Sequence, residues 1–109
     1  MAYDEGVAQR VREILQDYSG VTEKRMFGGI AFMINGNMCS GVVQSELMLR
    51  VGPDAYEQCL TRPHARIMDF TGRPMKGFIY VGESGFENDG DLLAWIETAV
   101  QFAGKLPPK

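Results

Sequence analysis

Two adjacent glycines, Gly28 and Gly29, form the first pattern that could support ligand chemistry. Loops that hold a phosphate aim consecutive backbone N–H groups at the anion and usually lead into the N-terminus of a helix. Here the glycines lead into Ile30-Ala31-Phe32, which is typical of a strand, and no Lys-Ser or Lys-Thr pair follows them. The pattern therefore favours a β-bulge or a tight turn between two strands.

Cys59 and His64 form the second pattern, because a thiol beside an imidazole can act as an activated nucleophile. Pro63 ends the predicted helix between them, and no carboxylate stands at a spacing that would orient the imidazole. His64 is the only histidine, so a metal site with two histidine ligands is excluded. We therefore expect His64 to be structural, and we expect no catalytic residue, no metal site and no cofactor.

Four carboxylates precede the last predicted helix. Acid–base catalysis by paired carboxylates requires a buried pocket that separates their pKa values. An EF-hand calcium loop requires a bidentate glutamate at its twelfth position, and that spacing is absent. Because the run is rich in glycine and asparagine, it predicts a solvated loop followed by a helix cap. The four residues are Glu83, Glu87, Asp89 and Asp91.

A cationic segment, residues 62–76, could bind an anion or nucleic acid, since Phe70 and Phe78 are interleaved with its charges. Nucleic-acid binding gains free energy from counterion release, and four cations make a small footprint. The net charge of −3 favours the alternative, a solvated rim that pairs with the acidic run 83–97. We expect any DNA binding to be weak and to vanish at moderate salt. The candidate residues are Arg62, His64, Arg66, Arg73 and Lys76.

Two aromatic residues, Trp95 and Phe102, flank the apolar stripe of the last predicted helix and could form an interface. Aromatic side chains at the edge of a helix contact can complete the core or form a patch for a partner. We expect Phe102 to belong to the core, and both possibilities stay open for Trp95. The stripe consists of Leu92, Ile96, Ala99 and Ala103, widened by Leu93 and Val100.

The elements that position these residues follow from hydrophobic periodicity and turn signals. Asp4 is a candidate N-cap, Ser19-Gly20 a helix stop, and Asn35-Gly36-Asn37 a hairpin turn. The order is α-β-β-β-β-α-β-β-α, which predicts an α+β fold with one mostly antiparallel sheet of five to six strands and helices packed on it. The predicted helices are 4–18, 53–62 and one that starts at Asp89 or Asp91 and ends at Ala103, and the predicted strands are 22–27, 30–34, 38–43, 47–51, 66–70 and 77–82.

Length and composition limit the class of protein. The 109 residues, 45% of them apolar, predict a single domain over residues 1–109 with one core. Cys39 and Cys59 are typical of buried thiols rather than a disulfide framework. The N-terminus has no apolar signal sequence, and no run approaches the roughly 18 apolar residues of a membrane span. We therefore expect a cytoplasmic protein without membrane contact.

Several stretches resemble the N-terminal domain of the TfoX/Sxy competence-regulator family. They are TEKRMFGGIAFMINGNMCSGVV, ELMLRVGPDAYE, RPHARIMDFTGRPMKGFIYV and DLLAWIETAV, which together cover nearly the whole chain. The resemblance implies an antiparallel sheet with flanking helices, similar to secretion chaperones, and a regulatory association with natural DNA-uptake competence. Full-length regulators of the family carry a second domain that resembles a helix-hairpin-helix module, whereas this chain ends at Lys109.

These observations predict a non-catalytic regulatory or adaptor domain that acts through protein–protein contacts, as a homodimer where strand edges of the sheet pair. Its protein partner is not identified by the sequence. Two alternatives remain open. One is a DNA-associated module that uses the Arg62–Lys76 segment, and the other is a small-molecule-binding protein or an enzyme of unknown reaction.

Overall fold

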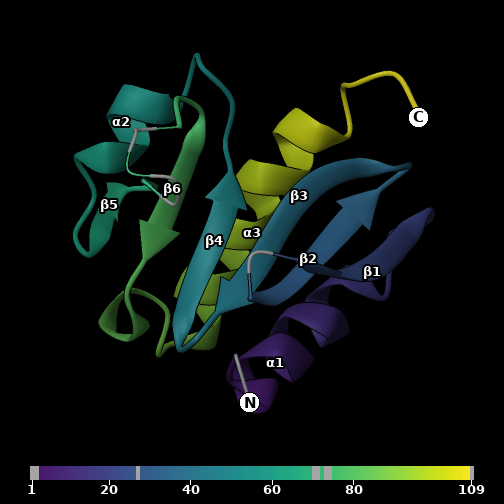
Figure 1. The fold of residues 1–109 in the computed structure, drawn as a ribbon, viewed down its shortest axis with the longest axis horizontal. Helices are drawn as coiled ribbons and strands as arrows, with labels where there is room; N and C mark the ends of the chain where they lie inside the picture. The colour runs from purple at the N-terminus through teal and green to yellow at the C-terminus, as the bar shows by residue number, and fades with distance from the viewer. Residues whose placement is uncertain (1–2, 27, 70–71, 73–74, 109) are drawn as a thin grey trace.

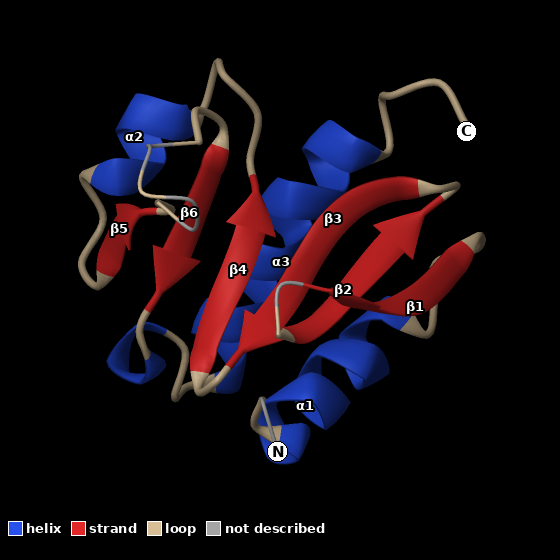
Figure 2. Cartoon of the chain, in the orientation of Figure 1, coloured by secondary structure: helices blue, strands red, loops and turns tan. Residues whose placement is uncertain are grey.

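A computed structural model describes residues 3–26, 28–69, 72 and 75–108. In this part of the chain, six strands form one open antiparallel sheet accompanied by three α-helices, so the predicted α+β fold and element order are confirmed (Figure 1, Figure 2). The elements are α1 (Glu5–Leu15), β1 (Val21–Met26), β2 (Gly29–Ile34), β3 (Asn37–Val43), β4 (Glu46–Arg50), α2 (Tyr56–Leu60), β5 (Ala65–Ile67), β6 (Phe78–Val81), the short 3₁₀ helix η1 (Glu83–Gly85) and α3 (Asp89–Ala103).

The sheet has the strand order β1-β2-β3-β4-β6-β5, so β1 and β5 are its two edges. Strands β1 to β4 pair in sequence, and the predicted turn between β2 and β3 has Asn35 at φ 52° and Gly36 at φ 83°. Positive φ at both central residues matches the right-handed twist of the flanking strands. After β4 the chain passes through α2 and β5 before β6 pairs with β4.

Helix α1 begins as predicted but ends earlier. The Asp4 side chain accepts hydrogen bonds from the N–H groups of Gly6, at 2.8 Å, and Val7, at 3.2 Å. These bonds satisfy two of the free donors at the helix start. The predicted end at residue 18 is wrong, because the helix stops at Leu15 and Tyr18 is 37% exposed. Tyr18 continues the apolar spacing of Val11, Ile14 and Leu15, but it lies beyond the end of the helix.

Helix α3 begins at Asp89, the earlier of the two predicted starts, and ends at Ala103 as predicted. Asn88 caps its first turn by accepting from the Gly90 N–H at 2.7 Å. Of the two residues predicted to widen its apolar stripe, Val100 packs against the core, but Leu93 is 42% exposed, so the prediction for Leu93 is wrong. Trp95, on the other flank of the stripe, is buried at 2%. The sheet therefore receives the side of the stripe that carries the tryptophan.

The segment between β4 and β6 contains shorter elements than predicted. The helix expected over residues 53–62 is regular only from Tyr56 to Leu60. The strand expected over 66–70 is β5, from Ala65 to Ile67, and residue 70 lies outside the described residues. Strand β6 is likewise short, from Phe78 to Val81.

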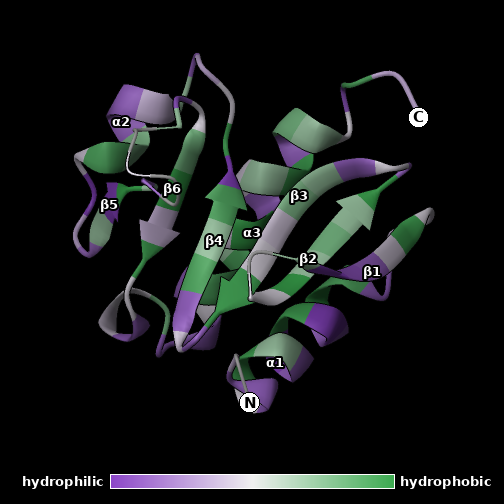
Figure 3. Cartoon of the chain, in the orientation of Figure 1, coloured by the Kyte–Doolittle hydropathy of each residue, from purple (hydrophilic) through white to green (hydrophobic). Residues whose placement is uncertain are grey.

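The core lies on both faces of the sheet. Helices α1 and α3 cover one face, behind the strands in Figure 1, and the large cluster on that face also includes Cys59 of α2. A smaller cluster on the other face centres on Met48, Met68 and Tyr80. Figure 3 shows the hydrophobic length of β2 and the hydrophilic middle of β1. Burial on both faces explains why the central strands are almost continuously apolar in sequence.

Candidate functional site

Strand β1 forms the longer edge of the sheet and is the best candidate for an interaction site. Residues Thr22 to Arg25 are exposed, in contrast to the buried residues of neighbouring β2. The opposite edge, β5, is only three residues long and contacts α2. An exposed edge strand presents unpaired backbone donors and acceptors to solvent, which another strand can pair with.

The alternation of backbone hydrogen bonds fixes which residues of β1 face outward. Asn35 donates its N–H to the Gly20 carbonyl at 2.9 Å, just beyond the paired residues Val21 and Ile34. Antiparallel pairs alternate between hydrogen-bonded and non-hydrogen-bonded positions. The even-numbered residues of β1 therefore direct their N–H and C=O groups to β2, and the odd-numbered residues Val21, Glu23 and Arg25 direct theirs away from the sheet.

The side chains of this edge are anchored on the helix-bearing face by an ion pair. Arg12 of α1 donates from Nε to Oε2 of Glu23 at 2.6 Å and from Nη2 to Oε1 at 2.8 Å. This paired geometry holds the pKa of Glu23 below its ordinary value. Surface hollows of about 240 and 250 Å³ flank the ion pair, and Arg25 lines the first of them. The edge therefore combines free backbone groups with space for incoming side chains.

The predicted cationic segment separates into two places. Arg62 and His64 line a surface hollow of about 280 Å³ together with Ser84, Asp91 and Trp95. The Arg62 guanidinium lies 3.5 Å from the centre of the Trp95 ring. His64 has a positive φ of 72°, and its carbonyl accepts from the Gly82 N–H at 3.0 Å.

Arg66 belongs to the opposite face of the sheet. Its guanidinium lies 4.7 Å from the Tyr80 ring and forms a two-point ion pair with Glu46, with Nε donating to Oε2 at 3.0 Å. Tyr80 is part of the methionine cluster, whereas Trp95 belongs to the helix-bearing face. The structure thus brings Arg62 and His64 together and separates them from Arg66. Lys76 is exposed, and Arg73 lies outside the described residues.

Trp95 and Phe102 occupy different environments on α3. The Trp95 indole is buried and its Nε1–H donates to the Gly85 carbonyl at 3.1 Å. Phe102 is half-buried, and the Arg50 guanidinium lies 5.3 Å from the centre of its ring and 5.6 Å from the centre of the Phe78 ring. Arg62 and the core therefore leave little of the Trp95 ring exposed.

The two cysteines lie in apolar surroundings that disfavour a thiolate. Burial raises the pKa of the Cys39 thiol to about 11. Burial also raises the pKa of Cys59. An activated cysteine nucleophile requires a lowered pKa. The raised pKa of Cys59 is therefore opposite to the lowered pKa that a Cys59–His64 nucleophile would need.

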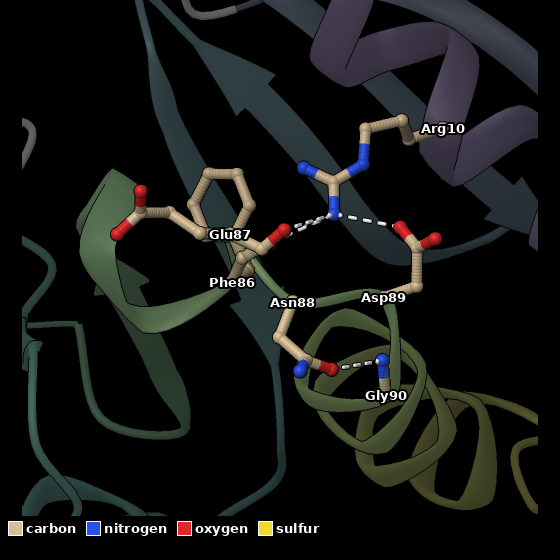
Figure 4. A network of polar contacts seen from close by, with 6 residues as sticks. All are labelled: Arg10, Phe86, Glu87, Asn88, Asp89 and Gly90. Atoms are coloured by element: carbon tan, nitrogen blue, oxygen red, sulfur yellow. Dashed lines mark hydrogen bonds and ion pairs between the residues drawn. The ribbon is translucent and has the colours of Figure 1, made fainter.

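The acidic run forms a structural junction between α1 and the start of α3, shown in Figure 4. The Nη2 of Arg10 donates to the carbonyl oxygens of Phe86 at 2.9 Å and Glu87 at 3.2 Å, and to Oδ1 of Asp89 at 3.0 Å. The predicted pairing between the acidic run and the cationic segment is not among the ion pairs of the described residues. Arg10, from the other end of the chain, takes that role.

Gly28 and Gly29 serve the β1–β2 connection, as the strand context predicted. Gly28 has φ 72°, a conformation that costs glycine little. Gly29 begins β2, and a Cβ there would overlap the carbonyl of Val42 on β3. Because these glycines precede a strand, they lack the helix N-terminus on which a phosphate-binding loop depends.

Within the described ranges, no group of three or more His, Cys, Asp or Glu side chains is arranged to hold a metal ion. None of the helices in these ranges combines the length and apolar character needed to cross a membrane.

Comparison with known proteins defines the family. The model of the TfoX N-terminal domain family matches residues 13–103, which is most of the 109-residue chain, and the chain therefore belongs to this family. The resemblance found in the sequence is thus confirmed. Neither the curated proteins nor the solved structures contain a significant match.

The β1 edge was not singled out by the sequence as a site, although a signal for it was present. The stretch Thr22 to Arg25 has three consecutive charged residues and alternates poorly between polar and apolar residues. Charged residues in a short strand are typical of a solvated edge. The poor alternation of Thr22 to Arg25 is therefore explained by the position of this stretch at the edge of the sheet.

Proposed function

We propose that this TfoX N-terminal domain is a non-catalytic regulatory or adaptor domain of the cytosol that acts through protein–protein contacts. The observation that supports it best is the exposed edge strand β1, whose residues Glu23 and Arg25 direct backbone groups away from the sheet. Strand addition to such an edge is a common mode of peptide and protein recognition, because main-chain hydrogen bonds supply affinity. Family membership supports a role in the regulation of DNA-uptake competence.

The surroundings of the titratable groups also favour a binding role over catalysis. Burial raises the pKa of both described cysteines, and Arg66 and Arg12 are engaged in ion pairs with carboxylates. In the hollow beside Arg62, the Arg62 guanidinium stacks on the Trp95 ring and the Gly85 carbonyl accepts a hydrogen bond from the Trp95 indole. A catalytic group is expected to show a pKa tuned toward its task, in a sheltered pocket.

The proposal is tested by capture of partners from cytosol of the source cells, with and without nuclease. The matched variants are Arg25→Pro, which removes an outward N–H while leaving the β1–β2 hydrogen bonds, and Arg62→Ala, which alters the hollow. We expect a protein partner that survives nuclease, is lost with Arg25→Pro and is retained with Arg62→Ala. Capture that depends on nucleic acid and on Arg62 would refute the adaptor function and support the DNA-associated alternative.

A further inference from the structure

We infer that the partner of the β1 edge is the β1 edge of a second copy of this chain, paired antiparallel about a two-fold axis at Lys24. The inference rests on the proposed function, because it names the partner of the same edge. Pairing in this way would join the two six-stranded sheets into one continuous sheet, which removes an exposed edge from each copy.

The two-fold symmetry limits the possible registers. An axis perpendicular to the sheet keeps every residue on its own face, so odd-numbered residues of β1 can stand opposite only odd-numbered residues of the second copy. An axis at Glu23 would place the two Glu23 side chains together, and an axis at Arg25 would place the two arginines together. Like charges directly opposite each other are destabilising.

An axis at Lys24 gives a different result. Glu23 of each copy then stands opposite Arg25 of the other copy, so two pairs of opposite charge form on the helix-bearing face. Opposite-charge pairs across antiparallel strands are favourable. Among registers centred on the charged residues of β1, charge complementarity therefore selects the one centred at Lys24.

The backbone pattern agrees with this register independently of the side chains. Glu23 and Arg25 are the residues whose N–H and C=O groups point away from β2, as the Asn35–Gly20 hydrogen bond establishes. Each Glu23–Arg25 position would become a hydrogen-bonded pair that exchanges two bonds, about four bonds in all. Lys24, whose backbone is engaged with β2, would occupy the non-hydrogen-bonded position on the axis.

The surface beside β1 can accept the incoming side chains. The Arg12–Glu23 ion pair leaves hollows of about 240 and 250 Å³ on its two sides, and Arg25 lines one of them. Among the described residues, Arg25 takes part in no ion pair. In the dimer, the second copy's Arg25 would join Arg12 at Glu23 and complete a three-residue charge network.

Lys24 opposes the pairing and sets its strength. The two Lys24 side chains would meet at the axis on the face opposite α1, where Lys24 is exposed and can extend into solvent. Lysine in an edge strand weakens strand pairing, so the dimer is expected to be weak and reversible. Lys24→Thr should therefore tighten the dimer by about tenfold or less, the range of a single cross-strand pair.

Disulfide trapping tests the register directly on the purified full chain. At a non-hydrogen-bonded position the two Cα atoms lie about 4.5 Å apart, within the range that a disulfide spans. We expect Lys24→Cys to form a covalent dimer under mild oxidation. Thr22→Cys is the matched control on the same face, because the two Thr22 positions would be displaced by about 13 Å along the strands. The native cysteines are buried.

Charge exchange provides the second measurement, by analytical ultracentrifugation across a range of concentrations. Arg25→Glu should weaken the dimer by about tenfold or more, since both cross-strand contacts become repulsive. An equimolar mixture of Arg25→Glu and Glu23→Arg chains should form a heterodimer, because every contact is again of opposite charge. Circular dichroism of each variant verifies that the fold is retained.

Two results would overturn the inference. One is a wild-type chain that stays monomeric at the highest soluble concentration while Lys24→Cys crosslinks no faster than Thr22→Cys. The other is a dimer whose affinity is unchanged by Arg25→Glu. These outcomes can be distinguished from failure of the proposed function. Capture of a different protein at β1 without self-association would contradict only the dimer inference. Self-association without any captured regulatory partner would contradict only the adaptor function.

Discussion

Replacement of Trp95 by phenylalanine tests whether this residue is a structural anchor or a contact for a partner. The indole is 2% exposed, its Nε1–H donates to the Gly85 carbonyl at 3.1 Å, and the Arg62 guanidinium covers it at 3.5 Å. Phenylalanine keeps an aromatic ring but loses the donor and part of the volume. The substitution therefore removes interior contacts while preserving the hydrophobic character of α3.

The magnitude follows from the lost contacts. Loss of the part-buried hydrogen bond to the Gly85 carbonyl costs about 0.5–1.5 kcal/mol. The smaller ring and the weaker stacking with Arg62 add on the order of 1 kcal/mol. We therefore expect Trp95→Phe to lower the free energy of unfolding by about 1.5–2.5 kcal/mol. Arg62→Ala, which removes only the stacking cation, should lower it by about 0.5–1 kcal/mol.

Urea denaturation followed by circular dichroism measures both variants with one probe, since Trp95 is the only tryptophan and its fluorescence disappears in the variant. Acrylamide quenching of the wild-type fluorescence should be weak. A Trp95→Phe chain within about 0.5 kcal/mol of wild type would refute the packing argument. If that chain also lost a protein partner, Trp95 would be an interface residue instead.

Three further predictions concern other positions. Gly52→Ala should lower the free energy of unfolding, measured in urea, by about 2–4 kcal/mol, because φ is 86° and a Cβ would lie 2.5 Å from Cε1 of Phe102. Gly28→Ala, with open space around the new Cβ, should cost clearly less. Equal costs would contradict an overlap between the Cβ at residue 52 and Phe102. Glu23→Gln should lower the free energy of unfolding by under about 1 kcal/mol at neutral pH. Because Arg12 lowers the pKa of Glu23, the difference in unfolding free energy from wild type should fade as the pH drops below 4.5. A difference that persists in acid would exclude the ion pair as its cause. The thiol of Cys39 should resist Ellman's reagent in the native state. Since burial raises its pKa from 9.0 to about 11, wild type should lose stability relative to Cys39→Ala as the pH rises between these two values. A difference in stability that stays constant with pH would argue against a buried thiol.

Local patterns in the sequence carried most of the architecture. The Asn35-Gly36 turn, the Asp4 cap and the apolar stripe of α3 are decided within a few residues, and the structure contains all three. The end of α1 was predicted too late because Tyr18 continues the apolar spacing after the helix has stopped. Spacing alone does not register the loss of helical hydrogen bonds.

The contacts that define the candidate sites could not be predicted in the same way. Arg10 reaches residues 76 to 79 positions later, and this depends on how α1 and α3 meet on the sheet. Arg62 and Arg66 are four residues apart in sequence yet contact opposite faces, because β5 begins between them. Strand order and register decide such contacts, and both are properties of the whole chain.

Amide hydrogen exchange in β1, followed by NMR at low and high protein concentration, tests the central claim most directly. At low concentration the amides of Thr22 and Lys24 should be protected by β2, whereas those of Glu23 and Arg25 should exchange rapidly. At high concentration the Glu23 and Arg25 amides should become protected as the second copy pairs with them. If these two amides exchange rapidly at every concentration, the β1 edge does not join two copies of the chain.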